Sequence, residues 1–109
     1  MLYPVVFSPE AGEQLVELYR YIAEHASAEI AASYTEAIVA HCERMQRFPQ
    51  RGILRDDIRP GLRITHFRRR TVIAFVVEET RVVILGVFHG GRNYEGVLLL
   101  EKDEKQDPV

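Results

Sequence analysis

What this 109-residue sequence lacks already excludes several classes of protein. It has a single cysteine, Cys42, so no disulfide can form within the chain and no thiolate-rich metal site is available. No apolar run approaches the roughly 20 residues that cross a bilayer, and the first residues lack the basic and apolar regions of a secretory signal. We therefore expect one soluble domain that works in the cytoplasm and makes no membrane contact.

Lysine is also scarce, because Lys102 and Lys105 are the only two in the chain. Nine arginines lie between Arg44 and Arg70, where only two acids occur, whereas the rest of the chain has five basic residues against fourteen acids. With a net charge of −2, the sequence is not that of a general polyanion binder. It predicts instead one local basic region, rich in a side chain that pairs well with carboxylate or phosphate.

Capping residues and apolar spacing predict a strand followed by two helices. Residues 2–7 are typical of a short strand, and Ser8 and Ser27 each precede a helical pattern with an acid in its first turn. The second helix is expected to end at Phe48, because a residue before proline avoids the helical region. The short connection between the helices favours an antiparallel pair.

The apolar faces of these helices are expected to supply the core, with Tyr21 exposed. They consist of Ala11, Leu15, Leu18, Tyr19 and Ile22 in the first helix, and of Ala31, Tyr34, Ile38, Cys42 or His41, Met45 and Phe48 in the second.

The second half of the sequence predicts an antiparallel meander of three strands, at residues 62–67, 70–77 and 82–89. Two prolines and two glycines mark residues 49–61 as a loop. Residues 96–109 are expected to form a tail that starts with an edge strand or an exposed apolar patch, VLLL, and ends in a flexible charged segment. The predicted fold class is therefore α+β, with the helix pair covering one face of an antiparallel sheet.

Four motifs occur in a characteristic order along the chain. They are the opening VVFSPEAGEQL, FPQRG at 48–52, RPGLRI at 59–64 and VILGVFHGGRNYE at 83–95. Through them the sequence resembles the ParE toxins of type II toxin–antitoxin modules, within the RelE/ParE superfamily, over about residues 3–95.

The resemblance implies a RelE/ParE-like toxin domain over residues 1–95, held inactive by a cognate, ParD-like antitoxin. ParE-type toxins poison DNA gyrase, whereas RelE-type relatives cut mRNA on the ribosome. A third possibility is a chain that has lost toxicity and serves as the antitoxin's partner in operator repression. In each case the DNA contacts are expected to come from the antitoxin.

A nuclease needs a base, an acid and cations around one phosphate. The candidates for these roles are His89, Arg92, Tyr94, Arg63 and Arg70. The net negative charge and the missing lysines count against docking on ribosomal RNA, and arginine serves poorly as a base. We therefore expect a gyrase inhibitor without catalytic residues and keep the nuclease as the alternative.

The basic region and the tail supply the predicted binding residues for the target or the antitoxin, namely Arg63, Arg68, Arg70, Arg92, Leu98 and Leu99. The purely structural interpretation of the basic region is that Arg44 and Arg47 satisfy a helix end and that the turn at Arg68 and Arg69 is solvated. We expect no metal or cofactor, because the four histidines show no ligand spacing and no phosphate-binding glycine loop opens a helix.

Overall fold

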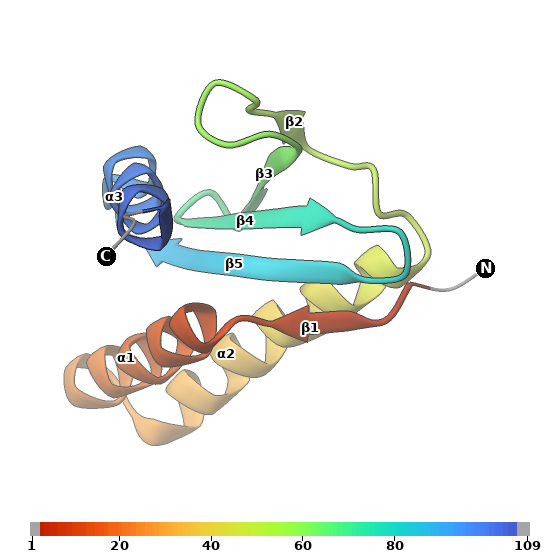
Figure 1. Ribbon diagram of the computed structural model, residues 1–109. Helices are drawn as coiled ribbons and strands as arrows, with labels where there is room; N and C mark the ends of the chain where they lie inside the picture. Colours follow the sequence, from red (N-terminus) through yellow and green to blue (C-terminus); the bar gives the residue numbers. More distant parts are fainter. Residues whose placement is uncertain (1–2, 107–109) are drawn as a thin grey trace.

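The computed structural model describes residues 3–106, with side chains over residues 3–100. Its elements, in chain order, are β1 (Val5–Phe7), α1 (Pro9–His25), α2 (Ala28–Glu43), the short 3₁₀ helix η1 (Arg44–Gln46), β2 (Ile53–Leu54), β3 (Leu62–Phe67), β4 (Thr71–Val77), β5 (Val82–His89) and α3 (Tyr94–Gln106). The predicted α+β class is confirmed, and α1 and α2 pack side by side on one face of the sheet (Figure 1).

The five strands form one sheet in the order β1-β5-β4-β3-β2. The meander from β3 to β5 is antiparallel as predicted, but β1 runs parallel to β5, so the sheet is mixed. No hairpin joins β1 to β5, and a pair of strands so far apart in the sequence can take either direction. This direction was beyond sequence reasoning.

Both helix starts are confirmed. The Ser8 side chain accepts a hydrogen bond from the backbone N–H of Ala11, and Ser27 accepts one from Ile30, each at 3.1 Å. Such caps satisfy backbone donors that the first turn of a helix leaves free.

The end of the second helix was predicted too late. The α-helix ends at Glu43 and tightens into η1, which changes the angular spacing of the residues that follow. As a result Phe48 is 67% exposed rather than part of the core face. Separately, Tyr19 on α1, also expected in the core, is 38% exposed.

A core lies on each face of the sheet. On the helix face the buried residues are Ala11, Leu18, Ile38, Cys42, Met45, Phe67, Ile73, Phe75, Val82, Ile84 and Val87. On the opposite face they are Ile58, Leu62, Ile64, Ala74, Phe88 and Leu98.

The predicted tail was wrong in its structure, because residues 94–106 form the helix α3. The Asn93 side chain accepts a hydrogen bond from the backbone N–H of Gly96 at 3.1 Å and so caps the first turn. Leu98 is fully buried in the second core, so it belongs neither to an edge strand nor to an exposed patch. The rest of the predicted tail, residues 107–109, lies outside the described residues.

Candidate functional site

Three consecutive arginines make the turn between β3 and β4. Phe67 pairs with Thr71, so the turn consists of Arg68, Arg69 and Arg70 alone. Arg68 and Arg69 have φ values of 50° and 66°, in the left-handed region that favours glycine. Each such residue lowers the stability of the fold by on the order of 1–3 kcal/mol. The backbone of the turn is therefore strained at Arg68 and Arg69.

Arg68 folds back over two rings of its own chain. Its guanidinium carbon lies 4.9 Å from the centre of the Phe67 ring and 5.6 Å from that of Tyr34. Cations at this distance are attracted to the face of an aromatic ring. The predicted binding residue Arg68 therefore also holds the turn against the helix side of the sheet.

Beside this turn, a cleft of about 510 Å³ opens between α1 and the end of β5. Its lining residues are Gln14, Glu17, Leu18, Tyr21, Arg70, Val87, His89, Gly90 and Arg92. Three of the five residues predicted for a nuclease therefore meet in one place, with Arg70, His89 and Arg92 on its wall.

A β-bulge decides that His89 faces this cleft. The pairing of β5 with β4 skips Leu85, so the alternation of faces shifts by one residue. Before the bulge Val82 and Ile84 face the helices, and after it Val87 and His89 do. Without the bulge, the imidazole would lie on the α3 side of the sheet.

Two hydroxyl groups hold the imidazole in place. His89 Nδ1 lies 2.9 Å from Thr71 Oγ1, which in turn lies 2.9 Å from the Tyr34 hydroxyl. Thr71 is fully buried, and the Tyr34 ring packs edge-on against His89. Burial, and then the positive charge of Arg70, lower the pKa of His89 and so favour the neutral form of its ring.

Because Nδ1 is occupied, Nε2 is the ring nitrogen that a ligand in the cleft can reach. The sequence predicted His89, but it gave no sign of Thr71 or Tyr34 as its partners, because their contact depends on the packing of α2 against β4.

Among the residues that the structure describes, Arg92 has only a weak partner. Its Nη1 lies 3.8 Å from Oε2 of Glu17, and the two side chains are 58% and 61% exposed. Pairs of this kind contribute at most about 1 kcal/mol in water. Arg92 is therefore available to an incoming anion.

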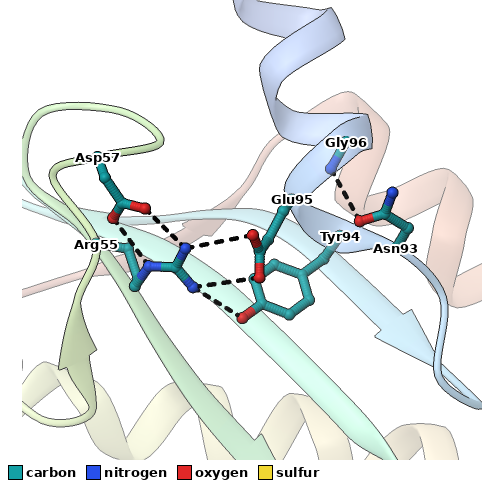
Figure 2. A network of polar contacts seen from close by, with 6 residues as sticks. All are labelled: Arg55, Asp57, Asn93, Tyr94, Glu95 and Gly96. Carbon is teal, nitrogen blue, oxygen red and sulfur yellow. Dashed lines mark hydrogen bonds and ion pairs between the residues drawn. The ribbon is translucent and has the colours of Figure 1, made fainter.

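Tyr94 lies on the other side of the sheet, packed near Phe88 in the second core. Its hydroxyl accepts a hydrogen bond of 3.2 Å from Arg55, which also pairs with Asp57 at 2.8 Å and Glu95 at 3.4 Å (Figure 2). These contacts join the start of α3 to the loop after β2. Sequence reasoning missed the role of Arg55, since nothing in the spacing of the two segments indicates it.

Arg63 is also outside the cleft. It stands opposite Phe75, four positions before Phe67 on β3, or roughly 13 Å along the strand from the arginine turn. Its Nη1 donates to the carbonyl of Arg51 at 3.5 Å. The predicted site is thus divided between the cleft and two other regions.

The two leucines of the predicted binding patch also separate. Leu98 is buried, whereas Leu99 is 43% exposed. Across the described residues, histidine, cysteine and acidic side chains nowhere gather into a group of three able to hold a metal ion.

The family model described as the ParE toxin of the type II toxin–antitoxin system, parDE, matches residues 5–94. The chain belongs to this family. The ParE toxin described here is also similar in structure to a chain of the chromosomal ParDE TA system from P. aeruginosa, with a TM-score of 0.71. The two are 20% identical, and the match covers 82% of this toxin and 97% of the other chain, so the likeness shows a common fold.

A comparison with curated protein sequences finds no match. Within the part of the toxin that the structure describes, no helix combines the length and the apolar character needed to cross a membrane.

Proposed function

We propose that this toxin arrests growth by binding and stalling DNA gyrase, without cleaving any bond itself. A ParD-like antitoxin neutralises it and supplies the DNA contacts of the complex, and all of these partners meet in the cytoplasm. Membership of the ParE toxin family supports the proposal, since gyrase is the target expected of ParE-type toxins.

The main observation against a nuclease is that the candidate catalytic residues lie in different parts of the structure. The hydroxyl of Tyr94 accepts from Arg55 on the α3 side of the sheet, whereas His89 faces α1 and α2. Acid–base catalysis requires both groups within hydrogen-bond reach of the same substrate. With Arg63 also elsewhere, the cleft contains His89 as its one residue suited to proton transfer near neutral pH.

One observation favours the alternative, a RelE-like endonuclease that cuts mRNA on the ribosome. His89, Arg70 and Arg92 line a single cleft. There an imidazole can transfer a proton while two guanidinium groups stabilise the negative charge of a phosphate. In that case His89→Gln would lower the cleavage rate by about 10²- to 10⁴-fold, the usual worth of a general acid or base.

Two reactions run in parallel test the proposal. Purified toxin is titrated into gyrase with relaxed plasmid, and separately into ribosomes that carry mRNA. A gyrase-binding toxin blocks supercoiling and leaves the mRNA intact, and adding the antitoxin restores supercoiling. Cleavage of mRNA with normal supercoiling would establish the nuclease. If the protein had neither effect, it would be a chain that has lost toxicity.

A further inference from the structure

We propose that the cleft between α1 and β5 receives an acidic side chain of the antitoxin, with Arg70 and Arg92 pairing with its carboxylate and His89 contacting it through Nε2. This inference rests on the proposed protein antitoxin, and it does not depend on whether gyrase is the target.

The first support is the placement of charge. The exposed arginine turn and Arg92 lie together at one end of the sheet. Among the described residues, Glu17 is the one acid that lines the cleft with Arg70 and Arg92. By contrast, the half-buried Arg55 and the exposed Arg81 each have a short ion pair with a neighbouring acid. At the cleft, Arg70 has no ion pair among the described residues, and Arg92 has only the long contact with Glu17.

The second support is the strain in the turn. Arg68 and Arg69 adopt left-handed conformations, at positions where glycine or asparagine would relieve the backbone strain. The Arg68 side chain is engaged with rings of the toxin, but Arg69 and Arg70 form no ion pair among the described residues. Backbone strain of this kind is typical of functional sites. Here the strained turn ends at Arg70, the residue of the turn that lines the cleft.

The contact of Glu17 with Arg92 indicates which kind of anion the cleft accepts. Glu17 already approaches Arg92 at 3.8 Å, so a carboxylate is the group that this guanidinium meets in the free toxin. The pair is long and exposed, and an incoming carboxylate with better geometry replaces Glu17 at little cost.

The acids of α1 favour a protein over a nucleic acid. Glu10, Glu13 and Glu17 line an adjoining depression that shares Arg92 with the cleft. A continuous row of phosphates would be repelled by these three carboxylates, whereas a peptide can insert one acid and present basic or neutral residues to them. The side chains of Leu18 and Val87 provide apolar contact for the rest of the inserted residue.

His89 makes this contact sensitive to pH. Around it stand Arg70 from the turn, Arg92, Glu17 and Tyr21 from α1, and Tyr34 from α2. In the free toxin burial and Arg70 lower the pKa of the imidazole, and a bound carboxylate raises it again. Binding therefore favours the protonated imidazole, and affinity is expected to rise as pH falls through the ordinary histidine range near 6.5.

The test is the affinity of purified toxin variants for the full-length antitoxin, measured by calorimetry. Arg70→Gln and Arg92→Gln are each expected to weaken binding by about tenfold to hundredfold, the worth of hydrogen bonds to a charged group. The matched control is Arg81→Gln, which removes an exposed arginine at the opposite end of β5 and should change affinity by less than about threefold.

The partner acid is then identified by changing each acid of the antitoxin's toxin-binding segment to its amide. The correct one shows no further loss against Arg70→Gln or Arg92→Gln, and His89→Gln removes the pH dependence. Because these are binding measurements on two purified proteins, they hold whether or not the toxin inhibits gyrase.

Two results would overturn the proposal. One is antitoxin affinity within about threefold of wild type for both arginine variants, with unchanged melting temperatures. The other is loss of binding to a fluorescent RNA or DNA oligonucleotide in these variants while antitoxin affinity is retained, which would assign the cleft to nucleic acid.

Discussion

Thr71 and His89 stand opposite each other on β4 and β5, and Thr71 Oγ1 lies 2.9 Å from His89 Nδ1. The same hydroxyl reaches Tyr34 on α2, so one buried threonine joins the end of the sheet to the helix layer. This small network fixes the imidazole that faces the cleft.

Thr71→Val should therefore destabilise the toxin by about 1 kcal/mol, because it removes two hydrogen bonds and leaves the Tyr34 hydroxyl and His89 Nδ1 without this partner in a partly buried place. Urea denaturation measures this loss. Thr80→Val, at an exposed position in the turn before β5, serves as the control and should have little effect. Equal stability of the two variants would mean that the network contributes nothing to the fold.

A glycine in the arginine turn should make the toxin more stable. Arg69→Gly removes the left-handed strain at a residue with φ of 66° and should stabilise the toxin by about 0.5–1 kcal/mol. The matched change Arg81→Gly, at a residue without positive φ, should destabilise it by a similar amount. Thermal melting compares the two, and a loss of stability in both would show that Arg69 bears no strain.

Leu98 and Leu99 should differ sharply although they are neighbours on α3. Leu98→Ala empties a fully buried position in the second core and should cost about 2–5 kcal/mol. Leu99→Ala, at 43% exposure, should cost less than about 1 kcal/mol. Chemical denaturation of both variants tests the burial, and similar losses would contradict the docking of α3.

The lowered pKa values of two histidines imply that the folding stability of the toxin falls in mild acid. Burial lowers the pKa values of His89 and His41 in the folded toxin, with Arg70 adding to the effect at His89 and Arg51 and Arg44 at His41. The unfolded chain therefore binds more protons below the ordinary value of about 6.5, and stability is lost as pH falls through it.

Urea midpoints measured on either side of that value should show this loss, and the double variant His41→Gln with His89→Gln should reduce it. If the double variant kept the full pH dependence of the wild type, other groups would be responsible.

Much of the fold could be read from the sequence, because its signals are local. The caps at Ser8 and Ser27 and the three strands of the meander follow from residue types at short spacing. What failed depends on events that alter a regular period. The tightening of α2 into η1 turned Phe48 outward, and the cap at Asn93 started a helix where a tail was predicted.

The candidate site followed from the sequence only as a set of residue types. Of the five nuclease candidates, the structure brings Arg70, His89 and Arg92 together in one cleft. The bulge at Leu85 and the contacts of Arg55 then decided which candidates share a face of the sheet, and both involve residues distant in sequence. Tyr94 is held on the other side of the sheet by Arg55, and Arg63 lies four positions before Phe67 on β3, away from the arginine turn.

The most direct measurement is the rate of plasmid supercoiling by purified gyrase as this toxin is added, with and without its antitoxin. A gyrase-binding toxin lowers the rate in proportion to the gyrase it occupies, and an equimolar amount of antitoxin restores it. A rate that stays unchanged at saturating toxin, in a preparation that still binds antitoxin, would contradict gyrase as the target.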